Sequence, residues 1–135
     1  MSYKIEEIEG IGAGYAQKLE AAGVRTTDDL LRKAATRSGR EALAAETGIS
    51  GKLILKWANH ADLFRIKGIA SQFAELLEAA GVDTVKEFRH RLAANLQPKL
   101  VEINEQKHLC HRVPSTTELQ RMIEQAKELQ PTLTY

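Results

Sequence analysis

The 135 residues are 43% hydrophobic and 27% charged, which is the balance of a soluble globular protein rather than of a disordered chain. The 19 Lys and Arg residues nearly cancel the 18 Asp and Glu residues, so the net charge of +1 excludes a protein that coats nucleic acid by bulk charge. The single cysteine, Cys110, excludes an internal disulfide, and no apolar run approaches the roughly 18 residues of a membrane span. The charged first ten residues do not resemble a signal peptide. We therefore expect a cytoplasmic protein with no membrane partner.

Every element predicted in the first half of the chain is a helix. Apolar residues at helical spacing predict a helix over 12–22, which ends at Gly23. Thr26 begins a capping sequence for a short helix over 28–33. Further helices are expected over 38–46 and from Ser50 onward to about residue 64.

The second half shows the same order of elements. A helix over 70–80 ends at Gly81, and Thr84 begins the next short helix. Helices follow over about 98–107 and about 116–129, and we expect 131–135 to be a frayed tail. No stretch alternates for long enough to form a strand. The sequence therefore predicts an all-α fold.

The two halves are copies of one another. Residues 8–24 and 66–82 align at an offset of 58, with 10 of 17 positions identical. Later apolar positions align only if the second copy carries an insertion near 105–113. We therefore divide the chain into unit 1 (1–62) and unit 2 (63–135), and we expect a pseudo-symmetric pair packed as one compact body. Its shared core should contain Leu19, Trp57 and Leu77.

The sequence Gly10-Ile11-Gly12 separates a short apolar helix from an amphipathic one. Its first glycine permits a tight turn, Ile11 fills the gap between the helices, and Gly12 permits the close approach of another molecule. The helix that follows presents unpaired backbone N–H groups and the positive end of its dipole, which can hold a phosphate. The alternative is that the turn serves only to join two helices.

These residues resemble the helix-hairpin-helix motif, and the chain from Ile5 to about Leu129 resembles a bacterial family catalogued as domain of unknown function family 4332, whose members are similar to tandem helix-hairpin-helix units. The resemblance implies the fold and, by analogy with DNA-repair and replication proteins, contacts between the hairpins and DNA. It also implies that a monovalent cation, K⁺ or Na⁺, could bridge the turn carbonyls and a phosphate. We expect a non-enzymatic module that binds DNA weakly, without sequence preference, through backbone amides and sugar–phosphate contacts. The candidate nucleic-acid-binding residues are Gly10, Ile11, Gly12, Ala13, Gly68, Ile69, Ala70, Arg65 and Lys67.

Departures from the DNA-binding pattern favour an alternative function, a protein-interaction or scaffold module that has lost DNA binding. The second turn has Ala70 in place of the second glycine, and its methyl group could block the approach of a phosphate. Neither turn is followed by Lys or Arg. Glu6, Glu7 and Glu9 place negative charge beside the first turn, whereas Lys67 adjoins the second.

No other pattern predicts catalysis or a metal centre. The chain has no nucleophile–base motif, no Walker loop and no paired carboxylates in an apolar setting. His108, Cys110 and His111 are potential zinc or copper ligands, but such close neighbours do not converge easily on one ion. His60 and His90 are isolated in the sequence. We therefore expect neither an enzyme nor a bound metal.

Overall fold

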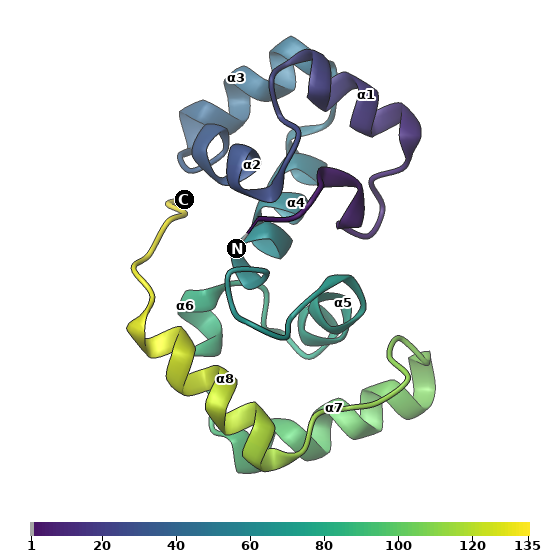
Figure 1. The fold of residues 1–135 in the computed structure, drawn as a ribbon, viewed down its shortest axis with the longest axis vertical. Helices are drawn as coiled ribbons and strands as arrows, with labels where there is room; N and C mark the ends of the chain where they lie inside the picture. The colour runs from purple at the N-terminus through teal and green to yellow at the C-terminus, as the bar shows by residue number, and fades with distance from the viewer. Residues whose placement is uncertain (1) are drawn as a thin grey trace.

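The computed structural model describes residues 2–135, and within that range it contains helices and no strand (Figure 1). Extended backbone pairs at an isolated bridge between Lys4 and Thr26. The all-α prediction is therefore confirmed. In this range no helix combines the length and apolar character needed to cross a bilayer. The elements in chain order are the 3-10 helix η1 (Ile5–Glu7) and the α-helices α1 (Ala13–Ala21), α2 (Thr27–Lys33), α3 (Arg37–Thr47), α4 (Gly51–Leu63), α5 (Ser71–Ala79), α6 (Val85–Phe88), α7 (Ala93–Lys107) and α8 (Thr116–Glu128).

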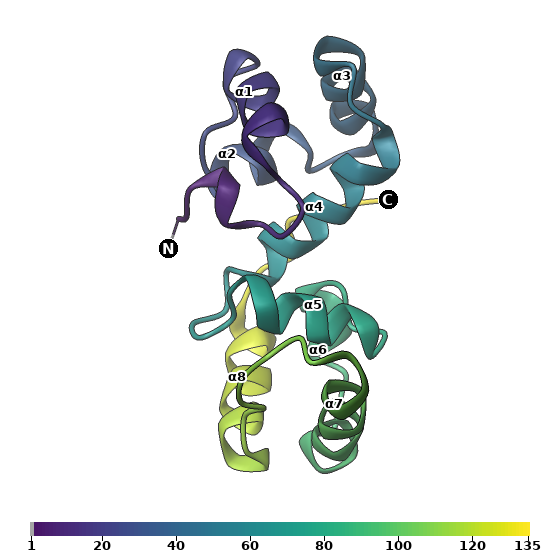
Figure 2. The same ribbon diagram turned by 90° about the vertical axis from the view of Figure 1, so that its right-hand side faces the viewer.

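Two groups of helices are joined by α4, as Figure 2 shows. The first group contains η1 and α1 to α3, the second contains α5 to α8, and α4 runs from one into the other. The buried side chains of both groups form one hydrophobic cluster, which includes Leu19, Trp57 and Leu77 as predicted. The chain is therefore one compact body with a shared core. A rotation near two-fold between the units stays a prediction.

Short polar residues begin most of the helices. The side-chain oxygens of Thr26 and Ser115 accept hydrogen bonds from Asp29 and Glu118, whose carboxylates bond back to the cap amides. The backbone N–H groups of Arg25 and Thr26 lower the pKa of the Asp29 carboxyl. In contrast, α1, α5 and α7 begin without a side-chain cap. The capping residues are Thr26, Thr36, Ser50, Thr84 and Ser115.

The ends of α1 and α5 are as predicted. Gly23 has a φ of +85° and Gly81 has a φ of +87°, so each takes the left-handed conformation that follows many helices. The next amide in each case, on Val24 and Val82, donates back to the carbonyl of a leucine in the helix at 2.8 Å. The repeated sequence therefore gives the same local structure in both units.

The predicted insertion near 105–113 falls at the end of α7 and in the connection to α8. Helix α7 begins at Ala93, earlier than the predicted position near 98, and so contains Pro98 in its interior. It ends at Lys107, and the next residue, His108, has a φ of +52°. The Asn104 side chain donates to the Cys110 carbonyl and accepts from the Cys110 amide, both at 2.9 Å. These two hydrogen bonds hold the connection against α7.

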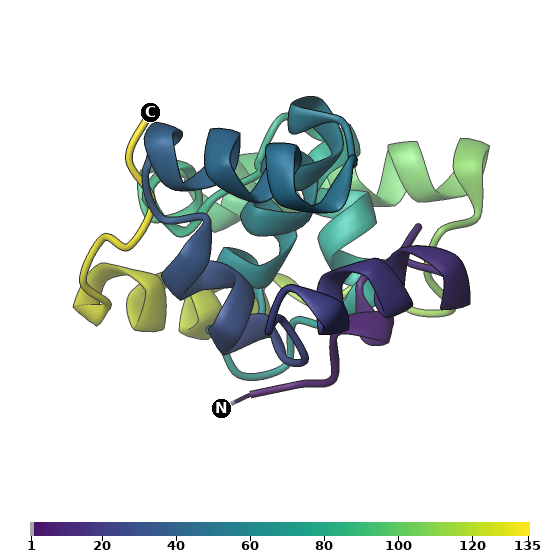
Figure 3. The ribbon, with the colours of Figure 1, turned by 90° about the horizontal axis from the view of Figure 1, so that it is seen from above.

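The expectation of a frayed tail at 131–135 is wrong. These residues, which we call the strap, lead from α8 back to unit 1 and reach the start of α3 (Figure 3). The Thr134 amide donates to the Ala35 carbonyl at 2.8 Å. Arg40, which is buried in α3, donates to the Thr134 carbonyl at 2.8 Å and to the Ala34 carbonyl at 2.9 Å. A buried guanidinium needs such acceptors, and the strap supplies one of them.

The last residue of the strap completes this attachment. The Tyr135 hydroxyl donates to Asn59 Oδ1 at 2.9 Å, and the Tyr135 ring lies 5.5 Å from the Arg40 guanidinium carbon. Burial and the negative charges of Asp62 and Asp83 raise the pKa of Tyr135 to about 12. The hydroxyl therefore keeps its proton for this hydrogen bond at neutral pH.

Candidate functional site

The first turn, residues 8–12, connects η1 to α1. Gly10 has a φ of +93°, which an L side chain rarely adopts. The Ile11 amide donates to the Ile8 carbonyl at 3.1 Å, and the Ile11 side chain is only 5% exposed. A Cβ added to Gly10 would lie 3.6 Å from Trp57 Nε1 of α4. The turn is therefore closed by a backbone hydrogen bond and backed by α4, while Ile11 fills the gap between the helices as predicted.

The second turn, residues 66–70, repeats this backbone. Gly68 has a φ of +94°, and the Ile69 amide donates to the Ile66 carbonyl at 3.2 Å. Ile69 is fully buried. A Cβ added to Gly68 would lie 3.0 Å from Met122 Cε of α8. The loss of the second glycine at Ala70 has therefore not changed the form of the turn.

Both turns lead into a helix whose first amides are unbonded. The first amides with a helical acceptor are those of Ala16 and Ala74, which donate to the carbonyls of residues 12 and 70 at 2.9 Å. Within the described residues no acceptor contacts the amides of 13–15 or 71–73. These amides add to the positive end of each helix dipole. Each turn therefore presents a small cradle of hydrogen-bond donors.

Gly12 is not required by the fold. Its φ is −83°, an ordinary value for any residue, and a Cβ added there would meet no atom within 4 Å. The corresponding Ala70 carries that methyl group in an exposed position with a φ of −129°. Glycine at position 12 therefore leaves open space beside the start of α1.

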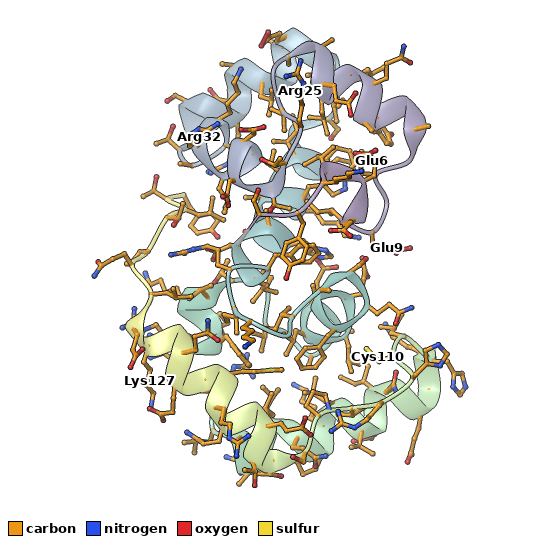
Figure 4. The ribbon with its side chains drawn as sticks, viewed as in Figure 1. Glu6, Glu9, Arg25, Arg32, Cys110 and Lys127 are labelled. Atoms are coloured by element: carbon orange, nitrogen blue, oxygen red, sulfur yellow. The ribbon has the colours of Figure 1, made fainter. Side chains whose placement is uncertain are left out.

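The two turns lie near one another on one side of the molecule. Ser71, the first residue of α5, donates from Oγ to Glu9 Oε2 at 3.4 Å. Figure 4 shows Glu9 and Cys110 on this side, with α5 between them. An open hollow here is lined by Glu9, Gly68, Ala70, Ser71, Gln72, Phe73, Cys110, His111 and Arg112. Sequence reasoning missed the contribution of 110–112, because only tertiary packing brings the insertion beside the second turn.

The two basic residues predicted for the second turn are not in equivalent positions. The Lys67 side chain is exposed, and no ion pair involves it among residues 2–135. The Arg65 side chain is only 18% exposed, and it donates to Asp62 Oδ1 at 2.8 Å and to the Gln130 carbonyl at 2.6 Å. Arg65 also lines a different hollow, together with Arg32 of α2. Lys67 is therefore available to a ligand of the second turn, whereas Arg65 binds the chain itself.

The charge beside the first turn is negative. Glu6, Glu7 and Glu9 are exposed. Beside the second turn, Arg112 pairs with Glu118, and the Ser115 amide and this pairing lower the pKa of the Glu118 carboxyl. The two turns thus share a backbone and differ in the charge around it.

Comparison of the sequence with known proteins assigns the chain to a family. The model of the family described as domain of unknown function (DUF4332) matches residues 9–129, which includes most of the first turn and all of the second. Neither a curated protein nor a solved structure matches the chain. The match covers well over half of the residues, and the chain therefore belongs to the DUF4332 family.

Proposed function

We propose that the chain is a non-enzymatic, cytoplasmic module that binds DNA weakly and without sequence preference, through two turns of the helix-hairpin-helix type. The observation that carries the proposal is Gly12. Neither its backbone conformation nor its packing requires glycine, yet its missing side chain leaves open space at the helix end whose first amides are unbonded. A phosphate oxygen is an acceptor that such amides bind well at a helix N-terminus.

The second turn would add one positive charge to this backbone site, because Lys67 is exposed beside it. His111 and Arg112 line the same hollow as the first residues of α5, although Arg112 is paired with Glu118. The exposed turn backbone also offers carbonyl oxygens, the hard ligands that K⁺ or Na⁺ could bridge to a phosphate. We expect contacts to about two to four phosphates, which gives a slope of log K against log[salt] of about −2 to −4. Affinity should be micromolar and independent of base sequence, because the contacts are to the sugar–phosphate backbone.

A second candidate function is a protein-interaction or scaffold module. The observation that favours it is the exposed acidic group at Glu6, Glu7 and Glu9, which repels phosphate at the first turn. A partner for that surface would be basic.

The first experiment is a fluorescence-anisotropy titration against single-stranded, duplex and branched DNA at several salt concentrations. Lys67→Glu should weaken binding at least tenfold. Lys52→Glu is the matched control, because Lys52 is also an exposed lysine but lies in the first turn of α4 and lines a different hollow, with Arg37 and Arg40. Binding that weakens equally in both variants would indicate general charge attraction. If the wild-type protein causes no change in anisotropy up to high micromolar concentration, the protein-interaction function is favoured instead.

A second pair of variants tests the backbone cradle. Gly12→Ala should lower DNA affinity several-fold, since its methyl group would stand between the amides and a phosphate. Gly51→Ala is the control, because Gly51 also begins a helix and its added Cβ would also meet nothing within 4 Å. Ala70→Gly should raise affinity. If all three variants bind DNA with the same affinity, the backbone amides at the turns do not contact the DNA.

A further inference from the structure

A cluster of ionisable side chains lies between α4 of unit 1 and α5 of unit 2. His60, isolated in the sequence, is fully buried, and its Nε2 lies 2.9 Å from Glu78 Oε2. Glu75 lies one helical turn before Glu78 on the same face of α5. One ligand atom from each of His60, Glu75 and Glu78 lies within 4.8 Å of the other two. The three therefore surround a volume that a single ion could fill.

A lysine ammonium already neutralises part of this cluster. Lys56, one turn before His60 on α4, places Nζ 3.7 Å from an oxygen of Glu75 and 3.7 Å from an oxygen of Glu78. Both distances exceed those of a normal hydrogen bond, so Lys56 acts there as a nearby charge. Its side chain is 42% exposed and can withdraw into solvent. Without Lys56, two carboxylates and an imidazole would remain.

We propose that His60, Glu75 and Glu78 bind a divalent transition-metal ion, with Zn²⁺ as the ion to test. Imidazole nitrogen and carboxylate oxygen are both donors that this class of ion accepts, and three such protein donors leave the fourth position to water. The ion would replace Lys56 as the positive charge of the cluster. The buried imidazole distinguishes this site from an exposed acidic surface, because His60 is a directional ligand already aimed at the carboxylates.

The hydrogen bonding of His60 sets the expected strength of the site. A carboxylate only accepts, so Nε2 carries the ring proton in the structure and donates it to Glu78. Nδ1 is buried and has no partner among the described residues. When the ion takes Nε2, the ring proton moves to Nδ1 and finds no acceptor. A missing second partner typically lowers metal affinity about 10- to 100-fold, so the dissociation constant should be micromolar.

Only α5 of unit 2 supplies the pair of carboxylates, and its equivalent α1 in unit 1 provides a matched control. At the offset of 58, Glu75 corresponds to Gln17 and Glu78 to Glu20 on α1. The Glu20→Gln variant thus removes the same charge from the equivalent helix of unit 1. Because an ion bound by the native state would also join α4 to α5, it should raise the unfolding temperature.

The test is isothermal titration of the full chain with Zn²⁺, together with thermal unfolding with and without the ion. We expect micromolar binding to the wild type, at least tenfold weaker binding for Glu75→Gln, and unchanged binding for Glu20→Gln. Lys56→Met should bind about tenfold more tightly, since the competing charge is gone.

Two results would overturn the proposal. One is the absence of both heat and a thermal shift in the wild type and in Lys56→Met. The other is binding that survives Glu75→Gln and Glu78→Gln but disappears in a His108→Ala/His111→Ala variant, which would place the ion in the insertion. Circular dichroism of each variant without metal establishes that its helices are intact.

Discussion

The two turns have the same backbone and different surroundings. Each is backed by the last long helix of its own unit, but the supporting side chain is Trp57 in α4 for the first turn and Met122 in α8 for the second. The second turn is also held by a hydrogen bond from the Lys67 amide to Gln125 Oε1 of α8, at 3.2 Å. The comparison shows that glycine and a buried isoleucine determine the form of the turn, while the neighbouring helix determines how tightly it is enclosed.

The largest expected effect compares the two isoleucines. Ile69→Ala should cost about 3–4 kcal/mol of unfolding free energy and Ile11→Ala about 2–3 kcal/mol, because Ile69 is fully buried and Ile11 keeps a small exposed area. Urea unfolding followed by circular dichroism measures both. A larger cost at Ile11 would show that the first turn is the more tightly packed of the two.

The two glycines with positive φ should give the next largest effects. Gly10→Ala should cost about 1–2 kcal/mol through backbone strain alone, since the nearest atom is at an ordinary contact distance. Gly68→Ala should cost a few tenths of a kcal/mol more, because Met122 Cε must move to admit the methyl group. Adding Met122→Ala to both glycine variants tests this explanation. In that background Gly10→Ala and Gly68→Ala should cost the same unfolding free energy.

At the ends of α1 and α5, replacing the glycine should cost the same unfolding free energy in both units. Gly23→Ala and Gly81→Ala should each cost about 1 kcal/mol, because both glycines have nearly the same positive φ and face only the end of a flexible basic side chain. The same urea experiment applies. Costs that differ by more than about 0.5 kcal/mol would contradict the equivalence of the two helix ends.

The smallest expected effect concerns Asp83, which corresponds to Arg25 in unit 1. Partial desolvation, followed by the charges of Glu78 and Glu87, raises the pKa of the carboxyl of Asp83, which is an exposed residue. Folding therefore disfavours the ionised form, and wild-type stability falls as pH rises from the unfolded-state pKa through the folded-state pKa. After solvent screening, Asp83→Asn should stabilise the protein at pH 7 by at most about 0.5 kcal/mol. This gain should disappear near pH 3, and a gain independent of pH would indicate another cause.

The sequence predicted the features that depend on neighbouring residues. The capping box at Thr26 and the helix ends at Gly23 and Gly81 are set within one or two turns of chain, so their residue types are sufficient to place them. The offset of 58 then predicted the second turn from the first, and the structure confirms its buried Ile69.

The features that the sequence did not predict depend on contacts between distant segments. Arg65 and Lys67 are close in sequence, yet Arg65 faces Asp62 and Gln130 while Lys67 faces solvent. His60 meets Glu78 only because α4 packs on α5, and no short pattern encodes that meeting. The same holds for the insertion beside the second turn.

The strap also affects the order in which the protein can fold. The contact between Arg40 and Thr134 spans 94 residues, and the contact of Thr134 with Ala35 spans 99. Closing such long loops is slow compared with forming a helix. During synthesis α3 is made long before residues 131–135, so the buried guanidinium of Arg40 has no acceptor from the strap until translation has passed both units. Unit 1 is thus the first to be synthesised and the last to be completed.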